Sequence, residues 1–294
     1  MSNEVRIIEA TAAECHDAVL TSIVAKYPRI IHAEVMTHRD RARNAASSRA
    51  IPFPKMTEMV TTDTFVPWHI GASAKGMQAG EELPDVLKGL FSQLWRGAMQ
   101  ESVERATAMH HIGETGVRLG YIPKDSPYAD ATVHKSLVNR ILEPYSYITV
   151  VMTATHWENF FRLRCHKDAE RHFQDLACQI RDTLASNKPE KRPVGYWHLP
   201  FIQADERDHP IPYLADVSTA RAARISYLTH LGVRDMSEDI RLFQTLCSGS
   251  GFGHWSPHEH VGVVNEGKQS GPFYGYTQYR KMFPNECAKE KWEV

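Results

Sequence analysis

The apolar positions of the chain recur at two spacings, one typical of strands and one of helices. Residues 4–9 alternate loosely between apolar and polar side chains, and residues 19–24 form a mostly apolar run, so both segments predict β-strands. Residues 147–152 are apolar and rich in β-branched side chains, which is typical of a buried strand. The pattern therefore predicts three strands, the last of them buried.

Helical spacing dominates the middle of the chain. Nine apolar side chains between residues 84 and 111 recur at this spacing: Val86, Leu87, Leu90, Phe91, Leu94, Trp95, Met99, Ala106 and Met109. They predict one long core helix. Shorter helices are predicted from Pro28 to His38, before Pro144, over 155–164 and over 237–247. Loops are predicted over 53–82, 113–131 and 187–212, where Pro and Gly are frequent or the periodicity is weak.

Composition changes this picture little. The chain has 294 residues, with 42% hydrophobic and 23% charged residues, which is ordinary for one large globular domain or two small ones. The formal net charge of -1 gives no global attraction to nucleic acid or to a membrane surface. No apolar run approaches the ~18 residues of a membrane span, and the start MSNEVRIIEA lacks the features of a signal peptide. The five cysteines form no CxxC pair, so we expect free thiols and a cytoplasmic protein.

The strongest chemical signal is a basic run over residues 37–52. It holds four arginines and two adjacent serines: Arg39, Arg41, Arg43, Arg49, Ser47 and Ser48. The arginine side chain offers a planar fork of donors that binds phosphate in two places at once. The run is expected to leave the C-terminal end of a helix as a loop and to form a phosphate site. The alternative is a solvated basic turn.

This run resembles the signature of the flavin-dependent thymidylate synthases. That signature reads Arg-His-Arg, two residues, Ser, one residue, Asn-Glu, one residue, Ser, one residue, Arg. His38, Arg39, Asn44, Ser47 and Arg49 match it without a gap. The departures are Thr37 for the first Arg, Ala42 for the first Ser and Ala45 for the Glu.

Two further segments extend the resemblance. Arg140 and Pro144 resemble an Arg-x-x-x-Pro segment whose arginine reaches the nucleotide phosphate in the family. Asn159 and Arg164 fall on a helix where the family has an Asn and, five residues later, an Arg that touches the pyrimidine. The alternative for Arg164 is a surface salt bridge to Asp168 at i+4.

The remaining matches occur in an unexpected order. Residues 219–227, TARAARISY, resemble the family's N-terminal Arg-Ala-Ala-Arg-Val-Ser segment, and residues 253–260, GHWSPHEH, resemble its Gly-His-x-Thr-Pro-x-Glu-His segment. Both precede the arginine-rich signature in the family but follow it here. The simplest explanation is a circular permutation, in which residues 217–260 stand for the family's N-terminal segment.

The tail, residues 261–294, is extra to this scheme. Gln278 and Arg280 echo a Gln-x-x-Arg pair of the family, and the tail could return to the site to replace missing donors; the alternative is a β-hairpin that covers the core. Gly249-x-Gly251-x-Gly253 follows a predicted helix and not a strand, so a dinucleotide-binding turn is not expected.

The resemblance implies a fold, a set of partners and a reaction. The fold is α+β, with long helices packed on an antiparallel or mixed sheet in a single domain over 1–294. The protein would be a homotetramer with sites at subunit interfaces and bound FAD. It would use NADPH and methylenetetrahydrofolate to methylate C5 of dUMP, and neither a membrane nor nucleic acid is an expected partner.

The site residues follow from the matched positions. Arg164 is the candidate catalytic residue, since a cation beside the base favours the polarised ring. The candidate nucleotide-binding residues are Ser47, Ser48, Arg49, Arg140 and Arg164. The candidate cofactor-binding residues are His38, Arg39, Asn44, Asn159, Ser226, His254 and Ser256. No metal site is expected, because His166 and His172, six apart, do not match the i,i+4 zinc spacing.

Two alternatives stay open. Thr37 and Ala45 replace a cation and a carboxylate of the family's site, so the substrate could be dCMP, or the product could carry hydroxymethyl in place of methyl. A non-catalytic RNA- or DNA-binding protein that uses Arg39, Arg41, Arg43 and Arg49 is a second class, which the near-zero net charge disfavours.

Overall fold

The structure is an α+β arrangement around one mixed sheet. The computed structural model describes residues 3–229, 234–248, 253–284 and 286. The main sheet has the strand order β3-β4-β2-β1-β5, with bounds β1 Glu4–Ala13, β2 Val19–Pro28, β3 Ala42–Ala45, β4 Tyr147–Ala154 and β5 Lys191–Arg192. Only the β1–β5 pair in this sheet is parallel among the described residues. The predicted strands at 4–9, 19–24 and 147–152 are therefore confirmed, at the centre of the sheet.

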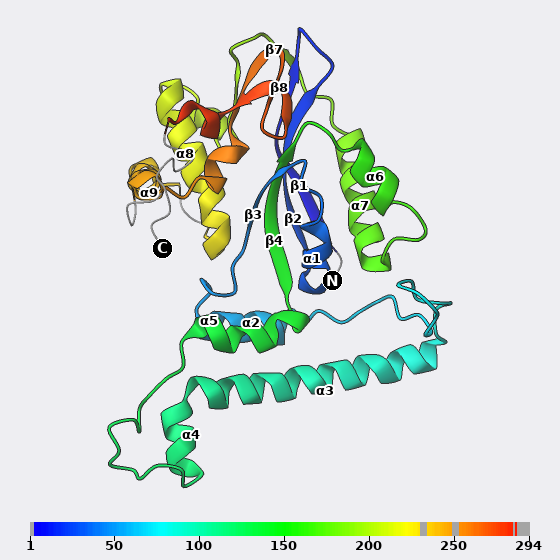
Figure 1. Cartoon of the computed structure of the whole chain (residues 1–294), viewed down its shortest axis with the longest axis vertical. Helices are drawn as coiled ribbons and strands as arrows, with labels where there is room; N and C mark the ends of the chain where they lie inside the picture. Colours follow the sequence, from blue (N-terminus) through cyan, green and yellow to red (C-terminus); the bar gives the residue numbers. More distant parts are fainter. Residues whose placement is uncertain (1–2, 230–233, 249–252, 285, 287–294) are drawn as a thin grey trace, which may run out of the picture.

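Helices cover both faces of this sheet (Figure 1). One face carries α6 Glu158–Arg164 and α7 Arg171–Ala185, and the other carries α8 Ile211–Arg224 with α9 Met236–Ser248 beside it. A layer below the sheet holds α2 Phe53–Thr62, α3 Asp85–His110, α4 Ile112–Arg118 and α5 Lys135–Val138. The short helix α1 His32–Val35 follows β2, as the proline at position 28 predicts.

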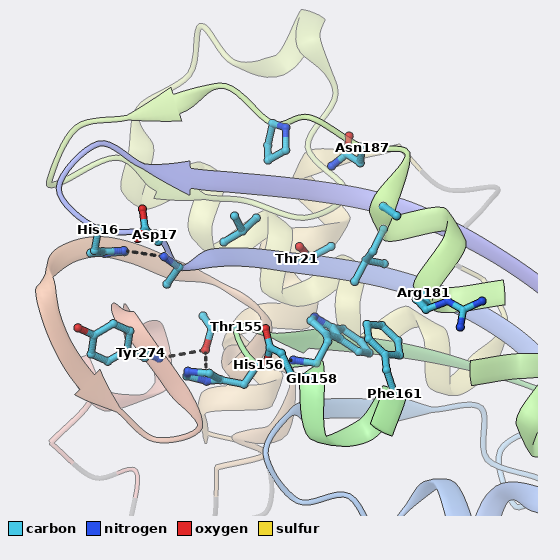
Figure 2. Close-up of a pocket in the computed structure, with 16 residues that line it drawn as sticks. His16, Asp17, Thr21, Thr155, His156, Glu158, Phe161, Arg181, Asn187 and Tyr274 are labelled. Atoms are coloured by element: carbon cyan, nitrogen blue, oxygen red, sulfur yellow. Dashed lines mark hydrogen bonds between the residues drawn. The ribbon is translucent and has the colours of Figure 1, made fainter. Parts of the chain in front are cut away.

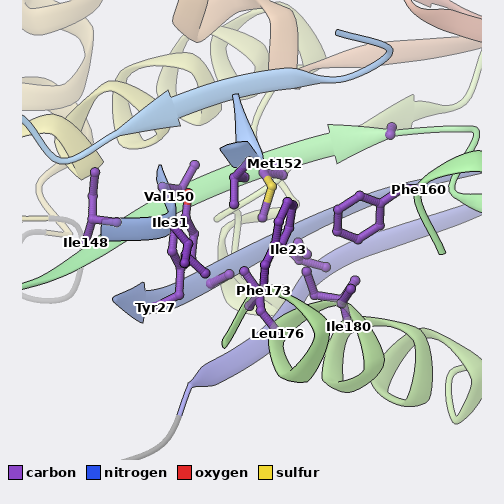
Figure 3. Close-up of a cluster of buried hydrophobic side chains, with 14 of the residues drawn as sticks. Ile23, Tyr27, Ile31, Ile148, Val150, Met152, Phe160, Phe173, Leu176 and Ile180 are labelled. Atoms are coloured by element: carbon purple, nitrogen blue, oxygen red, sulfur yellow. The ribbon is translucent and has the colours of Figure 1, made fainter. Parts of the chain in front are cut away.

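Alternation along the strands decides which side chains meet which helix. Ile23, Ala25 and Tyr27 on β2 pack against α7, with Phe173 and Leu176 among its buried residues (Figure 3). The intervening positions of β2 face the α8 side. This period of two is the signature of a strand buried on both faces, and it fixes the register, since a one-residue slip would exchange the two sets.

A second sheet joins the two ends of the sequence. It has the antiparallel order β6-β7-β8, with β6 Trp197–His198, β7 Gly262–Ser270 and β8 Phe273–Gln278. The Tyr276 hydroxyl donates to the Thr11 carbonyl at 2.5 Å, and an imidazole nitrogen of His16 lies 3.0 Å from the Gly275 carbonyl oxygen. The β7–β8 hairpin therefore closes against β1 and the turn that follows it.

The long helix exists, but it is not a core helix. α3 runs over Asp85–His110, as the spacing predicts, yet Met99 and Ala106 are its only buried residues. Val86, Leu90 and Leu94 are 77%, 51% and 65% exposed. The sequence prediction of a core helix is wrong, because part of the apolar stripe, Val86, Leu87, Leu90 and Leu94, is exposed, while Trp95 and Met99 face the rest of the chain.

All four predicted loops contain regular structure, and the one over 187–212 holds the short strands β5 and β6. The segment 53–82 begins with α2, whose buried Phe53, Met56 and Val60 have helical spacing. The segment 113–131 overlaps α4, and the loop expected over the basic run contains the strand β3. Pro52 is the N-cap of α2 and Pro54 lies in its first turn, so these prolines start a helix.

None of the helices over residues 3–229, 234–248, 253–284 and 286 is both long and apolar enough to cross a membrane.

Candidate functional site

The strand β3 holds the centre of the basic run at the edge of the main sheet. It pairs antiparallel with β4, Ala42 opposite Thr153 and Ala45 opposite Val150. Its side chains alternate: the Asn44 amide nitrogen lies 3.5 Å from the Ala222 carbonyl of α8. Arg43 donates back to the carbonyls of Met36 and His38, at 2.7 and 2.8 Å. The adjacent residues Arg43 and Asn44 thus contact different parts of the fold.

Beyond β3 the chain meets the segment expected to be permuted. The Ser47 backbone N–H donates to the Ser226 carbonyl at 3.1 Å, across 179 residues of sequence. Both residues line one cavity of about 640 Å³. Its lining residues are Ser47, Arg49, Ala50, His134, Lys135, Ser136, Ser226 and Tyr227. Hydroxyl, guanidinium and ammonium groups gather at this cavity, which is the donor set that binds a phosphate. We call it the Ser47 cavity.

Two candidate phosphate ligands are engaged elsewhere. The Ser48 hydroxyl is buried and donates to a Glu143 carboxylate oxygen at 2.5 Å. Arg140 lies 3.6 Å from the same carboxylate, as an exposed i,i+3 pair, and Arg29 lies 3.7 Å from it. Neither Ser48 nor Arg140 lines the Ser47 cavity. The Ser48–Glu143 bond instead holds the turn after β3 against the 3₁₀ segment Asn139–Tyr145, and the Arg140–Glu143 pair lies within that segment.

Arg164 lies on the opposite side of the motif, beside His38. Its Nε donates to His38 Nε2 at 2.9 Å, and its guanidinium packs 4.8 Å from the Phe173 ring centroid. The alternative salt bridge does not form, because α6 ends at Arg164 and the Asp168 carboxylate lies 3.4 Å from His166. The partner of Arg164 in this contact is the imidazole of His38 and not a carboxylate. The contact therefore does not neutralise the positive charge of Arg164.

The protonation state of His38 follows from that bond. An arginine can only donate, so Nε2 of His38 is the acceptor and Nδ1 carries the proton. Burial against Phe160 and Phe173, together with the Arg41 and Arg164 charges, lowers the pKa of His38 to about 4. His38 is thus a neutral support for Arg164 throughout the physiological range.

The second segment expected to be permuted forms a 3₁₀ turn, Ser256–His260, that packs on β3. His254 and Ser256 are exposed on it. Gln278 donates to the Glu259 carbonyl at 3.2 Å, and Arg280 forms an ion pair with the Glu259 carboxylate. The tail does form a hairpin, and it also returns to this motif, although its donors bind Glu259 and fill no open position of the Ser47 cavity.

The arginines of the TARAARISY segment are structural. Arg221 is buried and binds the carboxylates of Glu206 and Asp239, at 2.7 and 2.8 Å. Arg224 binds the other oxygen of Asp239 at 2.7 Å. These ion pairs fix the end of α8 against α9, which in turn places Ser226 beside Ser47.

A chain of buried hydrogen bonds runs beneath the second sheet. Thr11 Oγ1 lies 2.9 Å from His198 Nδ1, and His198 Nε2 lies 2.8 Å from Ser22 Oγ. Ser22 Oγ lies 2.6 Å from Thr153 Oγ1, which lies 2.8 Å from His260 Nδ1. Burial lowers the pKa of both His198 and His260 to about 3. Both imidazoles are therefore neutral in the folded protein.

Acid is expected to destabilise the fold through these two imidazoles. Their pKa values are about 3 in the folded state and about 6.5 when unfolded, so the unfolded chain binds more protons between these limits. Stability is complete above pH 6.5 and falls as the pH drops, by about 1.4 kcal/mol per pH unit for each histidine. Urea unfolding from pH 7.5 to 4.5 measures the slope. His198→Asn should reduce it, and an unchanged slope would contradict this account.

The candidate flavin ligands do not converge on one cavity within one chain. Asn44 and Ser226 lie on the α8 side of β3, and His38 lies against α6 and α7. Arg39, Asn159, His254 and Ser256 are exposed. The residues of a single chain thus do not fit a complete flavin site, and the four exposed ones are open to a second chain. Over the described residues, no cluster of His, Cys, Asp and Glu is arranged to hold a metal.

Comparison with known proteins gives little beyond this. No family model matches the sequence, and no curated protein matches it. Two solved structures of the UMP/dUMP methylase PolB from Streptomyces cacaoi, bound with 5-Br UMP and 5-Br dUMP, are similar at 13% and 12% identity. Their TM-scores are 0.41 and 0.42, and each alignment covers 63% of this chain and 90% of that chain. At TM-scores this low, the likeness carries no argument about fold or activity.

The sequence analysis predicted Ser47, Arg49 and Ser226 as site residues and missed the other five residues that line the Ser47 cavity, of which Lys135 and Tyr227 carry the most chemistry. Lys135 lines it and donates to the Ala50 carbonyl at 2.8 Å, and the exposed Tyr227 lines it beside Ser226. Tyr227 directly follows a matched serine and could have been found from that position. Lys135 belongs to no motif, and only the packing of α5 beside the turn after β3 reveals it.

Proposed function

We propose that the protein is a flavin-dependent enzyme that adds a one-carbon group to C5 of a pyrimidine deoxynucleotide. The favoured reaction is methylation of dUMP to dTMP, with methylenetetrahydrofolate as the carbon donor and NADPH as the reductant. The observation that carries the proposal is the contact between Ser47 and Ser226. Two segments that each resemble a piece of one family's site, far apart in sequence, line the same cavity.

The donors of the Ser47 cavity suit the 5′-phosphate. Arg49 and Lys135 supply two positive charges, and Ser47 and Ser226 supply hydroxyl donors on short side chains. Charge-assisted hydrogen bonds of this kind are about twice as strong as neutral ones. The phosphate would therefore be held by residues from β3, α5 and the turn after α8.

Arg164 would serve the base. A guanidinium beside the pyrimidine stabilises negative charge that develops on the ring, and this makes C5 a better nucleophile. In one chain Arg164 contacts His38, which comes before β3, whereas Ser47 comes after β3. The Arg164 contact also lies on the face of the strand opposite the α8 side. We therefore propose that Arg164 of one subunit completes the site begun by Ser47 of another.

A flavin would supply the redox chemistry when bound, so no nucleophile from the protein is needed. Arg39, Asn159, His254 and Ser256, exposed in the single chain, would hold it together with His38 and Asn44, whereas Ser226, first expected to bind the flavin, lines the phosphate cavity.

The test is binding. We expect the protein to purify with FAD or to quench the fluorescence of added FAD, and to bind dUMP by calorimetry. Lys135→Met should weaken dUMP binding about tenfold, since it removes a charged hydrogen bond, and should leave FAD binding unchanged. A colourless protein that neither quenches FAD nor binds dUMP would end the proposal.

Self-association is part of the proposal. The stripe Val86, Leu87, Leu90 and Leu94 on α3 leaves apolar surface exposed that a homotetramer would bury. We expect the wild type to sediment as a tetramer, and Leu90→Glu with Leu94→Glu to shift it to smaller species. Gln93→Glu, between them on the same helix and also exposed, is the control. A monomeric wild type would contradict both the tetramer and the shared site.

The cytidylate alternative stays open within the proposal. Thr37 and Ala45 are the positions that depart from the family, and Thr37 lies 3.5 Å from an Arg164 nitrogen. If the substrate is dCMP, or the product carries hydroxymethyl, we expect the residues around Thr37 and Arg164 to be the ones that determine it.

The nucleic-acid alternative loses support from the structure. Arg41 is 3% exposed, and Arg43 is bound to backbone carbonyls. Of the four arginines of the run, only Arg39 and Arg49 are exposed, so they do not form a continuous basic surface.

A further inference from the structure

One wall of the Ser47 cavity carries an exposed aromatic ring. Tyr227 lines this cavity and is 55% exposed. Within the residues that the structure describes, the Tyr227 side chain has no hydrogen bond and no contact with another ring. The ring shares the cavity with the cations of Arg49 and Lys135. It is therefore free to contact a ligand that these cations bind.

The Ser47 cavity is larger than a phosphate group requires. Its volume of about 640 Å³ lies in the range of pockets that enclose a whole small molecule. Three parts of the chain form it: the turn after β3, the start of α5 and the turn after α8. The first two supply the cations, and the third supplies the aromatic ring. A ligand that uses both needs an anionic group and a flat ring in the same molecule.

The backbone directly after Tyr227 has an unfavourable conformation. Leu228 has φ 55° and ψ 36°, which lies in the left-handed region. At this position after a helix, glycine is the usual residue, because a side chain disfavours the left-handed conformation. Among the described residues, Phe201 is the other non-glycine residue with a positive φ. Such conformations persist only where the surroundings determine them, and they are most frequent at functional sites.

Two sets of contacts hold Leu228 in place. Its backbone N–H donates to the Ile225 carbonyl at 3.1 Å, and the Thr229 N–H donates to the Arg224 carbonyl at 3.2 Å. Its side chain packs against two hydrophobic clusters, one between the main sheet and α7 and the other joining α2, α3 and α5. The turn is thus anchored on its C-terminal side, and this anchor fixes the direction in which the chain presents Tyr227.

We propose that the Tyr227 ring binds a face of the nucleotide base, and that Leu228 is the residue that positions this ring. The inference rests on the proposed function for the identity of the ligand. The phosphate lies on Arg49 and Lys135, and the base lies on Tyr227. An aromatic ring stacks on the face of a base, whereas an arginine donates to its edge. Tyr227 and the Arg164 of another subunit therefore act on different parts of one base.

Tyr227 supplies affinity and does not select the base. Every base has a π-face, so stacking on an aromatic ring is tolerant of base identity. Uracil and cytosine differ in the hydrogen-bonding groups at their edges, which a stacked ring does not contact. We therefore expect Tyr227 to contribute equally to the binding of dUMP and dCMP. The choice between them falls to the residues around Arg164.

Two probes that differ only by the base test the stacking. dUMP carries the base and deoxyribose 5-phosphate lacks it. We expect calorimetry to show that the wild type binds dUMP about tenfold more tightly than deoxyribose 5-phosphate. Tyr227→Leu removes the aromatic face, so it should weaken dUMP and dCMP each by about tenfold and leave deoxyribose 5-phosphate unchanged. Tyr227→Phe keeps the ring and should match the wild type within about twofold.

Two further variants separate the ring from other causes. Lys135→Met should weaken dUMP and deoxyribose 5-phosphate by the same factor, because both ligands carry the phosphate. Tyr128→Leu removes an exposed tyrosine that does not line the cavity, and it should change neither affinity. Unchanged binding of deoxyribose 5-phosphate by Tyr227→Leu also shows that this variant is folded.

The positioning role of Leu228 has its own test. Leu228→Gly keeps the left-handed conformation accessible but removes the side chain that anchors the turn. We expect it to lower the ratio of dUMP affinity to deoxyribose 5-phosphate affinity by about threefold, because the Tyr227 ring is then less well oriented. A purely structural role would change stability and leave this ratio unchanged, and that result would overturn the positioning role.

A larger cavity, of about 730 Å³, is the alternative place for a base to bind (Figure 2). It shares no lining residue with the Ser47 cavity. Its lining includes Arg181 but also the carboxylates of Asp17 and Glu158, so it does not suit a phosphate. Ala185 is exposed on α7 and lines this larger cavity. Ala185→Trp should therefore fill it and leave the binding of dUMP unchanged.

Four results would each overturn the inference. They are equal affinity of the wild type for dUMP and deoxyribose 5-phosphate, unchanged dUMP binding in Tyr227→Leu, a loss in that variant that spares dCMP, and a loss of dUMP binding in Ala185→Trp. In each of these cases the phosphate-binding nucleotide site of the proposed function still stands. If neither probe binds to the wild type, the proposed function itself fails, and this inference fails with it.

Discussion

Replacing Arg164 by lysine is expected to lower turnover on dUMP by about 100-fold or more, the usual scale for one electrostatic donor. Lysine keeps the charge but loses the planar fork. Its three donors share one nitrogen, so it cannot reproduce the arrangement in which Nε holds the 2.9 Å bond to His38 while the separate Nη groups face the base. Because Arg164 lies at the end of α6 and is not fully buried, the free energy of unfolding should change by about 1 kcal/mol or less.

Tritium release from C5-labelled dUMP, run beside C5-labelled dCMP, measures the effect. Arg171→Lys, an exposed arginine at the start of α7, is the matched control and should keep full activity. Release from dCMP alone by the wild type would replace the thymidylate assignment with the cytidylate one. A fully active Arg164→Lys enzyme would show that Arg164 only braces His38.

The largest loss of stability is expected at Asp239. Its carboxylate is fully buried and binds Arg221 through one oxygen and Arg224 through the other, at 2.8 and 2.7 Å. Asp239→Ala removes the negative charge and leaves two buried or half-buried guanidinium groups short of a partner. Breaking a buried pair in this way typically costs about 3–5 kcal/mol. Urea unfolding with a constant m-value measures the change.

Two comparisons separate this effect from a general sensitivity to substitution. Asp239→Asn keeps the shape and should cost less than the alanine variant. Asp205→Ala removes one of two carboxylate partners of the exposed Arg234, the other being Glu206, and should barely move the midpoint because solvent screens this pair. A small loss in Asp239→Ala would mean that Glu206 alone satisfies Arg221.

The strands of the sheet centre could be predicted because their side chains carry the signal. β2 and β4 are buried on both faces, and their apolar runs follow directly from that burial. β3 reads Ala-Arg-Asn-Ala and has no β-branched residue. It is a strand because it pairs with the edge of β4. A strand that forms through such a tertiary contact cannot be recognised from its local sequence.

The long helix shows a second limit. Its spacing correctly predicted the helix and its apolar face, but periodicity cannot say what covers that face. The same holds for Arg221. The segment around it was identified by resemblance, yet its partners, Glu206 and Asp239, lie on other elements and were not predicted.

The candidate site was predictable to the extent that motifs carried it. Ser47 and Arg49 were expected to bind the nucleotide and Ser226 the flavin, and the structure places all three on one cavity. Ser48 and Arg140 were expected to bind phosphate, but both contact the Glu143 carboxylate instead. The matched motifs do not include Glu143, so this contact could not be predicted from them.

The packing of the second sheet against β1 affects how the chain folds during its synthesis. Tyr276 donates its hydroxyl to Thr11 across 265 residues of sequence. At about 5–20 residues per second, synthesis of that interval takes on the order of 13–50 s. During this time the ribosome has released β1 while the hairpin that covers its end does not yet exist. The apolar positions near Ala13 and Leu20, fully buried in the finished fold, are then open to other nascent chains. Expression at lower temperature or with a chaperone should therefore raise the soluble yield more for this chain than for one whose first strand pairs only locally.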